Sequence, residues 1–457
     1  MPGVDAGFLY METPTLHMHT IKMALLDVSG LPAYSFEGFK DELVARLHLL
    51  PPFRRRVVEV PLQLNHPVWV EDHEVDADRH VLHHVLAPGS GIAELEDLVG
   101  RVSSSPLDRS EPLWEMHVVE GLPDGRVAVI TKMHHAMADG IAANALLSNI
   151  TDTGPGLGAE KPLEPTPEPR DLVLRGLIDA IRQIALVPRL LHRTVLSLLA
   201  VIRLRKGSPV RTPRPLLDTP RTSFNGAITA RRCFATATLP LDDFKRVRKA
   251  VPDVTLNDVV LAVVAGAMRS WMDAHGEHLD RSLTAGVPVG TDALSDVARL
   301  GGNRVSNLFT SLHTDLDDPI ERLLAISRTT TAAKEMQRTL GPDMLADWSQ
   351  FTPPAPFRAF MKAYSRLLGA DRHRAPFNLV VSNVPGPKEP VSFGGARMTE
   401  MFSVGPILEG IALNVTVWSY LDQMHFSLLS CPDNISDLRG LATRLQPALD
   451  EQLRNAL

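Results

Sequence analysis

Residues 126–150 read RVAVITKMHHAMADGIAANALLSNI and pass from a strand-like run, through a short polar segment, into a helix-like run. The β-branched and apolar residues of 126–133 predict a strand. Residues 114–120 predict another, and Leu122-Pro123-Asp124-Gly125 between them is typical of a hairpin turn. The segment His134-His135-Ala136-Met137-Ala138-Asp139-Gly140 therefore lies where a sheet strand ends and a helix begins.

The two histidines of this segment predict one functional and one structural side chain. Side chains alternate along a strand, so His134 and His135 should point in opposite directions. An imidazole with an ordinary pKa of ~6.5 is mostly neutral near pH 7 and can act as a general base. Asp139 would either orient the imidazole or hold the loop by pairing with an arginine elsewhere. Gly140 permits a tight turn into the helix.

A purely structural interpretation stays open for this segment. It would be a partly buried histidine pair followed by a helix cap. His83-His84 also lie in a strand-like run, without a following Asp-Gly. A histidine pair alone therefore does not define a function.

Composition excludes several classes of protein. The chain has 457 residues, 44% of them hydrophobic, and a formal charge of −6, which allows two or three domains and gives no reason to expect a nucleic-acid partner. Its two cysteines, Cys233 and Cys431, exclude a disulfide scaffold and a four-cysteine zinc module. Zinc needs three or four convergent ligands, and no third histidine or cysteine is near His134 and His135, so no metal site is expected. The N-terminal MPGVDAGFLYMETPT does not resemble a signal peptide, and no membrane-spanning helix is expected because no run of 18 apolar residues occurs.

Proline clusters divide the chain. Residues 151–170 contain five prolines and predict a stiff connector, and a second cluster follows near residue 215. We expect an N-terminal domain at 1–150, a connecting region at 151–215 and a C-terminal domain at 216–457. Both large parts mix helices and strands. The expected helices and strands besides the hairpin are a helix capped by Ser35 and ending at Pro51-Pro52, a helix from Thr255 to about Ala274, and strands at 377–382, 413–420 and 424–430.

HHAMADG and four further motifs carry a resemblance to a known family. The motifs, in chain order, are Asp5, Phe8-Leu9 and Glu12 with His17-Met18-His19; Pro112-Leu113-Trp114; Asn257-Asp258; and Ser382-Asn383-Val384-Pro385-Gly386-Pro387. The chain resembles the bacterial wax ester synthase/diacylglycerol acyltransferases. That family belongs to the HHxxxDG acyltransferase superfamily, which includes chloramphenicol acetyltransferases and condensation domains. The resemblance spans nearly the whole chain.

The resemblance implies a fold, a reaction and a set of site residues. The fold would be α/β (α+β), with two chloramphenicol-acetyltransferase-like domains, each a mixed sheet with flanking helices, around a central tunnel. The reaction would move a long-chain acyl group from acyl-CoA to diacylglycerol, with no bound cofactor. The implied catalytic residues are His135 as general base, His134, Asp139 and Gly140. The implied substrate-binding residues are Glu12, Trp114, Asn257, Asp258, Ser382 and Asn383.

Several of these substrate-binding residues also have a structural interpretation. A tryptophan at a strand start, such as Trp114, is more often a core anchor than a ligand contact. Asp258 fits the N3 position of a capping box opened by Thr255. Ser382-Asn383 end a strand before a Pro-Gly turn. Asn257 is the one that local structure explains least.

Other functions remain open from the sequence. A fatty alcohol acceptor would make the protein a wax ester synthase, and loss of turnover would leave a lipid-binding homologue. A carrier-bound acyl donor would make it a condensation-type transferase. A serine hydrolase is disfavoured because the chain has no G-x-S-x-G segment. The acceptor, the acyl length and the oligomeric state are not predicted.

Residues 170–214 form a basic segment with a net charge of +8. On a helical wheel at ~100° per residue, Arg175, Asp179, Arg182, Arg189 and Arg193 share one stripe, and most of the remaining circumference is apolar. Pro188 should kink this helix. Either its apolar face packs on the protein, or it lies on an anionic lipid surface. The second interpretation predicts a cytoplasmic protein, peripheral at the inner face of a membrane or on lipid inclusions.

Overall fold

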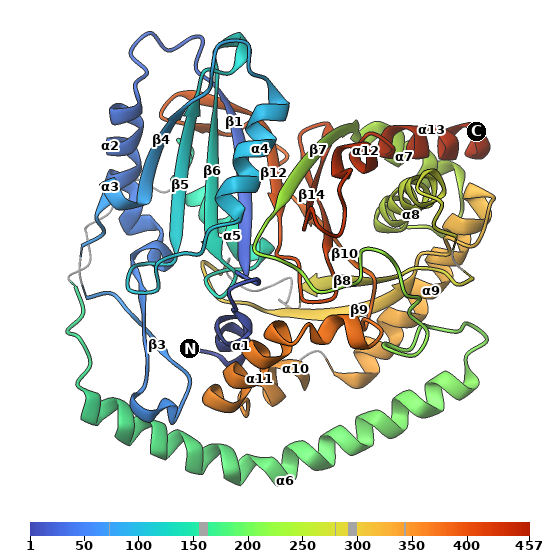
Figure 1. The fold of residues 1–457 in the computed structure, drawn as a ribbon, viewed down its shortest axis with the longest axis horizontal. Coiled ribbons are helices and arrows are strands. Elements are labelled where there is room, and N and C mark those ends of the chain that lie inside the picture. The colour runs from blue at the N-terminus through green and yellow to red at the C-terminus, as the bar shows by residue number, and fades with distance from the viewer. Residues whose placement is uncertain (73, 155–162, 279, 291–298, 342–343) are drawn as a thin grey trace.

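The computed structural model describes residues 1–72, 74–154, 163–278, 280–290, 299–341 and 344–457, and within them the chain forms two six-stranded sheets that lie side by side (Figure 1). Both sheets are mixed. In the first, β4 and β5 are parallel and the other pairs antiparallel, and in the second, β10 runs parallel to both β13 and β8. The expected α/β class with two related halves is therefore confirmed.

The first sheet contains strands from both ends of the chain. Its order is β11 (Ser392–Phe393), β12 (Ala396–Val404), β1 (His19–Asp27), β6 (Arg126–His134), β5 (Trp114–Glu120) and β4 (Val81–Val85). A separate ribbon pairs β2 (Arg56–Val58) with β3 (Val68–Val70). β11 and β12 come from the part of the chain expected to form the C-terminal domain, so this sheet crosses the boundary expected from the sequence.

The second sheet is built from the C-terminal part of the chain. Its order is β7 (Cys233–Pro240), β14 (Gln423–Ser430), β13 (Leu413–Tyr420), β10 (Leu379–Pro385), β8 (Thr284–Gly290) and β9 (Val305–Ser311). Its largest core cluster is formed with α8 (Leu256–Ala274), whose side chains from Val259 to Val264 are almost fully buried. Such a helix is apolar on most of its circumference because it is enclosed by the sheet and neighbouring helices.

The remaining helices flank the two sheets or join them (Figure 1). They are α1 (Gly3–Met11), α2 (Phe36–Arg46), α3 (Ala77–His80), α4 (Ile92–Ser103), α5 (Gly140–Ile150), α6 (Pro169–Gly207), α7 (Leu241–Ala250), α9 (Pro319–Leu340), α10 (Met344–Ser349), α11 (Pro354–Arg366), α12 (Leu438–Ala442) and α13 (Leu445–Ala456). α4 packs on both β6 and β7 and so joins the two halves. Gly100 allows this approach, because a Cβ there would lie 2.9 Å from the carbonyl oxygen of Arg232.

Most locally encoded elements form as expected. β5 and β6 make the predicted hairpin, as do β13 and β14. The capping box of Thr255 and Asp258 opens α8. Ser35 caps α2, but that helix ends at Arg46, and short 3₁₀ turns occupy the residues up to the prolines. The expected connector at 151–170 lies partly outside the described residues.

Helix α6 runs as one curved 39-residue helix along an edge of the molecule, with Pro188 inside it (Figure 1). A narrow seam of side chains contacts the protein body at a spacing of three or four residues. It comprises Leu172, Gly176, Asp179, Gln183, Val187, Leu190, Thr194, Ser197, Val201 and Leu204. Leucines and isoleucines on the other side are exposed, with Ile181 and Ile184 at 69% and 70%. The interpretation that the apolar face packs on the protein is therefore wrong.

The sequence-based exclusion of a membrane-spanning helix is also corrected here. α6 is long and apolar enough to cross a membrane by length and composition, and only 6% of its most apolar window is buried. The sequence criterion required an uninterrupted run of 18 apolar residues, and the chain has none. The average hydropathy of a helix can still be high enough for a membrane span when a few polar residues are interspersed along it.

Candidate functional site

The HHxxxDG segment is fixed by backbone hydrogen bonds to two neighbouring strands. The amide of His134 donates to the carbonyl of Leu113, and the amide of His135 donates to the carbonyl of Met18 at 2.8 Å. Asp139 then caps α5, because its Oδ1 accepts hydrogen bonds from the amides of the second and third helical residues at 3.1 and 3.0 Å. The strand and the helix cap therefore hold the loop at both ends.

The two histidines occupy different environments, as their alternation predicted. His134 is 1% exposed, and its Nδ1 accepts a hydrogen bond from the amide of Ala136. Burial lowers its pKa well below 6.5. His135 stacks on the ring of Phe8, with the ring centres 4.4 Å apart, and lines a cavity between the two halves. Its Nδ1 is fully buried, so Nε2 is the ring nitrogen that can reach a substrate.

His135 is held in its basic, neutral form by its surroundings. Burial lowers its pKa, and the charge of Asp139 acts in the opposite direction without being the larger influence. A neutral imidazole at neutral pH can accept a proton from a hydroxyl group. The electrostatics of the site therefore fit general-base chemistry.

Asp139 connects the loop to the other half of the molecule. Its Oδ2 accepts hydrogen bonds from Arg299 at 2.5 Å and from the amide of Arg304 at 2.9 Å. An isolated β-bridge joins Ala138 to Gly302 beside it. Of the two predicted roles, the geometry supports the structural ion pair with a distant arginine. Arg299 has no recognisable signal in the sequence, since it lies 160 residues away.

A second link reaches the same loop from the N-terminal helix. Asn303 donates from its side-chain amide to the carbonyl of His135 at 2.8 Å and to Oδ1 of Asp5 at 2.7 Å. Burial raises the pKa of Asp5 to about 6. Asp5, which the sequence showed only as part of an opening motif, thus helps to position the backbone of the predicted base.

The cavity beside His135 is lined by side chains from both sheets, and polar residues are interspersed there with apolar ones; it is called the polar cavity below because it holds these polar groups. Of the predicted residues, His135, Asp139, Gly140 and Ser382 line it. A Cβ at Gly140 would lie 3.1 Å from a methyl group of Val384, so glycine is needed there for close approach of β10 rather than for an unusual backbone angle. The other polar residues lining the cavity are Thr20, Lys22, Asn307, Ser403, Asn414 and Thr416.

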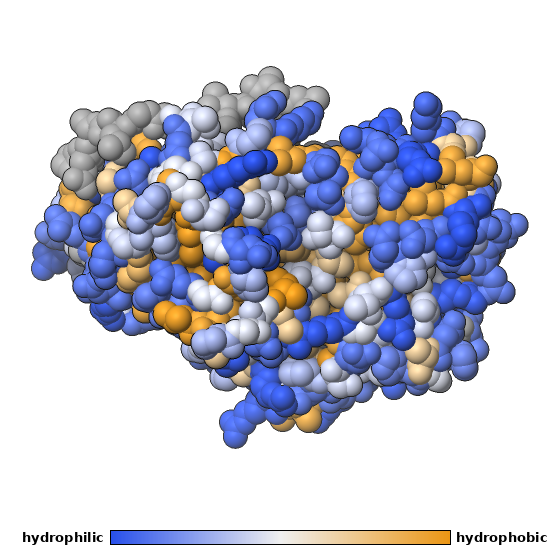
Figure 2. All heavy atoms as spheres, turned by 90° about the horizontal axis from the view of Figure 1, so that it is seen from above, coloured by the Kyte–Doolittle hydropathy of each residue, from blue (hydrophilic) through white to orange (hydrophobic). Residues whose placement is uncertain are grey.

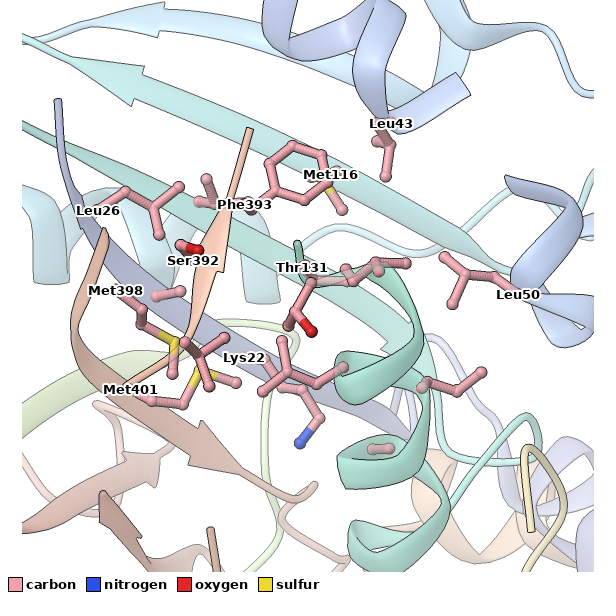
Figure 3. Close-up of a pocket in the computed structure, with 18 of the residues that line it drawn as sticks. Lys22, Leu26, Leu43, Leu50, Met116, Thr131, Ser392, Phe393, Met398 and Met401 are labelled. Carbon is pink, nitrogen blue, oxygen red and sulfur yellow. The ribbon is translucent and has the colours of Figure 1, made fainter. Parts of the chain in front are cut away.

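An apolar cavity adjoins this polar cavity within the first sheet (Figure 3). Side chains from α2, α5 and the strands enclose it, including Leu26, Leu43, Met116, Phe393 and Met401. Lys22 lines both cavities. A lysine within the otherwise apolar run 21–26 was the signal in the sequence that could have identified this junction. Whether the cavities join into the expected tunnel stays a prediction.

The remaining predicted substrate-binding residues lie elsewhere. Trp114 is buried and donates its indole N–H to the carbonyl of Phe53. Asp258 caps α8 and accepts a hydrogen bond from the hydroxyl of Thr330. Glu12 pairs with Arg109 at 3.4 Å. These three, with Asn257 and Asn383, do not line the described cavity, so the geometry gives no support to direct substrate contacts by them.

Comparisons with known proteins identify a family that matches most of the chain. The family model described as the wax ester synthase/diacylglycerol acyltransferase catalytic domain matches residues 1–260, and the WS/DGAT C-terminal domain matches residues 301–452. A protein of Mycobacterium tuberculosis H37Rv, provisionally named a diacylglycerol O-acyltransferase, is 38% identical over 441 residues, covering 96% of this chain and 92% of that protein. A second from the same strain, with the same provisional name, is 35% identical over 458 residues, covering 99% and 90%.

Solved structures extend the comparison to the fold. The wax ester synthase/diacylglycerol acyltransferase of Marinobacter aquaeolei VT8 matches with a TM-score of 0.69 and 28% identity, covering 100% of both chains. The first condensation domain of the CDA synthetase matches with a TM-score of 0.58 and 14% identity, covering 100% of this chain and 96% of that one. The second likeness concerns the fold alone.

Proposed function

Because the chain belongs to the wax ester synthase/diacylglycerol acyltransferase family, we propose that it transfers a long-chain acyl group from acyl-CoA to the hydroxyl of diacylglycerol, making triacylglycerol. The observation that carries the proposal is the placement of neutral His135 in a cavity lined by both sheets, on a loop tied to both halves. A cavity between the two halves fits a reaction in which two substrates meet.

His135 would act as the general base. Its Nε2 takes the proton of the acceptor hydroxyl as that oxygen attacks the thioester carbonyl carbon. The C–S bond then breaks, and the protonated imidazole returns the proton to the departing CoA thiolate. Such proton transfer contributes about 10²–10⁴-fold to the rate. The remaining acceleration comes from holding both substrates in one enclosed site and excluding water.

The two adjoining cavities fit the two parts of an acyl thioester. The apolar cavity offers almost only aliphatic and aromatic side chains to a hydrocarbon chain. The polar cavity carries His135 and several hydroxyl and amide side chains. A chain seated in the first would place its thioester at the second. This arrangement needs no bound cofactor or metal ligand from the protein.

Helix α6 would hold the protein on a lipid surface. Its seam contacts the body, for example through the indole N–H of Trp348, which donates to the hydroxyl of Thr194 at 3.0 Å, and the side-chain amide of Asn65, which donates to Asp179 at 3.3 Å. This attachment favours a helix lying flat on the lipid over one that crosses the membrane. Its exposed apolar face points away from the body, whereas the opposite face of the molecule is mostly hydrophilic with apolar patches (Figure 2). The lipid would be the inner face of the membrane or a lipid inclusion.

The test is product formation by the purified protein. Release of CoA thiol from palmitoyl-CoA should depend on added diacylglycerol, and mass spectrometry should detect triacylglycerol. A panel that includes a fatty alcohol distinguishes a wax ester synthase. An acyl group bound to a carrier protein, offered in place of palmitoyl-CoA, distinguishes a condensation-type transferase. Folded protein that releases no thiol with any acceptor would contradict the proposal and leave a lipid-binding homologue.

A further inference from the structure

Lys22 lies where the polar and apolar cavities meet. On one face of β1, Thr20 lines the polar cavity, Ala24 and Leu26 line the apolar cavity, and Lys22 between them lines both. Alternate residues of a strand share a face, so this face changes from polar to apolar at the lysine. Figure 3 shows the nitrogen of Lys22 pointing away from Leu43 and Phe393, which lie at the apolar end.

The ammonium group of Lys22 is buried without a carboxylate beside it. The side chain is 7% exposed, donates a hydrogen bond to the hydroxyl of Ser403 at 3.0 Å, and lies 4.3 Å from the ring centre of Trp418. Within the described part of the chain, no carboxylate oxygen lies within ion-pair distance of its Nζ. Burial lowers its pKa to about 7, with Asp139 acting in the opposite direction. Burying an amine in this way costs stability.

We infer that Lys22 is a further catalytic residue, whose Nζ donates a hydrogen bond to the thioester carbonyl oxygen and stabilises the negative charge that forms on it. The assignment depends on the proposed acyl transfer. Of the residues that the structure describes, Lys22 is the one that lines both cavities, so a chain seated in the apolar cavity with its thioester in the polar cavity would place the carbonyl group near this nitrogen. Among the described residues lining either cavity, the other titratable groups are His135 and Asp139.

The step leaves the proton balance of the reaction unchanged. When the acceptor oxygen adds to the carbonyl carbon, the C=O electron pair moves to oxygen, and the N–H of Lys22 stabilises this oxyanion. When the pair returns and the C–S bond breaks, the proton held by His135 goes to sulfur. Lys22 ends the cycle as it began. A preformed donor in a dry site typically contributes 10²–10³-fold to kcat.

Lys132 on the neighbouring strand β6 supplies a matched comparison. It is fully buried, pairs with Glu115 at 2.8 Å and donates to the carbonyls of Val102 and Ser105. It lines neither cavity. Lys132 therefore directs its N–H groups at acceptors within the protein. Lys22 instead donates to the hydroxyl of Ser403, which itself lines the polar cavity. Lys132 has a structural role, and Lys22 is positioned for substrate.

The experiment compares Lys22→Met, Lys22→Arg and Lys132→Met with the wild type, using palmitoyl-CoA and a short soluble alcohol. Methionine keeps an unbranched stem against Trp418 and removes the donor. Lys22→Met should lose about 10²–10³-fold in kcat, and Lys22→Arg should recover at least tenfold of that loss. Lys132→Met should melt at a lower temperature but keep its kcat within threefold. If Lys22→Met does not fold, Lys22→Gln replaces it, with at least a tenfold loss expected.

Binding of two CoA derivatives separates failure of this inference from failure of the proposed function. Palmitoyl-CoA has the carbonyl oxygen, and the thioether hexadecyl-CoA lacks it. The wild type should bind the thioester at least fivefold more tightly than Lys22→Met does, and both should bind the thioether equally. This binding measurement can be made even if the protein does not turn over its substrates. Equal thioester binding together with a kcat within threefold of the wild type would overturn the role of Lys22, even in an active enzyme.

Discussion

The cavity beside His135 and helix α6 are built in opposite ways. The cavity is assembled from strands of both sheets and fixed by hydrogen bonds from Asn303 to Asp5 and to the carbonyl of His135, and from the amide of Arg304 to Asp139. Helix α6 is one local element that touches the body along a narrow seam and exposes most of its apolar side chains. Chemistry needs groups fixed to a fraction of an ångström, whereas adhesion to a fluid lipid surface needs only area and charge. The two tasks should therefore be separable by mutation.

The largest expected effect comes from removing the base. His135→Ala should lower transfer to every acceptor by about 10²–10⁴-fold, because it removes the proposed proton acceptor of the hydroxyl group. His134→Ala is the matched control and should mainly reduce thermal stability, since His134 lies outside the cavity. Thiol release and melting curves on both variants check this. Near-normal turnover by folded His135→Ala would dismiss the assignment.

The second largest effect is expected on lipid binding, when charges on α6 are removed. Changing Arg175, Arg182 and Arg189 to Gln should weaken binding to anionic vesicles by about 10²-fold, at roughly 1 kcal/mol for each charge near the surface. Arg193 is kept because it pairs with Asp347 on α10. Changing three exposed arginines elsewhere, Arg248, Arg338 and Arg454, gives the same net charge as a control. Vesicle sedimentation at low and high salt measures the effect, since exposed charges are screened.

A smaller effect is expected for the link between the halves. Asp139→Asn keeps a helix cap but removes the ion pair with Arg299. Activity should fall about tenfold and the melting temperature by several degrees, because a buried ion pair that joins the loop to the second half is lost. Circular dichroism melts and thiol release provide the test. Lost activity with an unchanged melting temperature would indicate a direct chemical role for Asp139.

The smallest effect is a stability change that depends on pH. The pKa of Lys22 is lowered to about 7, so the unfolded chain binds more protons than the folded chain between pH 7 and about 10.5. The penalty of burying Lys22 is thus complete below pH 7 and disappears as the pH rises through that range. Lys22→Met should raise the melting temperature at pH 6.5 by more than it does at pH 9.5. An equal shift at both values would contradict the lowered pKa.

Local sequence patterns predicted most helices and strands, but they could not predict contacts between residues far apart in the sequence. The Pro123-Asp124-Gly125 turn and the Thr255 capping box are decided within a few residues, so the β5–β6 hairpin and α8 were predictable. The entry of β12 into the first sheet depends on pairing with β1, 370 or more residues away in sequence. No local pattern encodes such a partner.

The sequence also predicted only part of the candidate site, because several of its contacts join residues far apart in the chain. The HHxxxDG motif identified His135, Asp139 and Gly140, and Ser382 came from the family resemblance. The partners that hold the loop, Arg299 and Asn303, lie in a segment without regular structure. Trp114 and Asp258 have local roles, as a core anchor and a helix cap, that their motifs alone could not distinguish from substrate contacts.

We propose that His135 performs acyl transfer in an internal cavity, whereas α6 only holds the protein on the lipid surface. The most direct measurement is the rate of thiol release with two acceptors, diacylglycerol in anionic vesicles and a short soluble alcohol, for the wild type, His135→Ala and the triple arginine variant of α6. We predict that His135→Ala loses both activities, whereas the α6 variant loses at least tenfold with vesicles and stays within twofold with the soluble alcohol. A folded His135→Ala protein that still acylates the soluble alcohol at the wild-type rate would contradict the account.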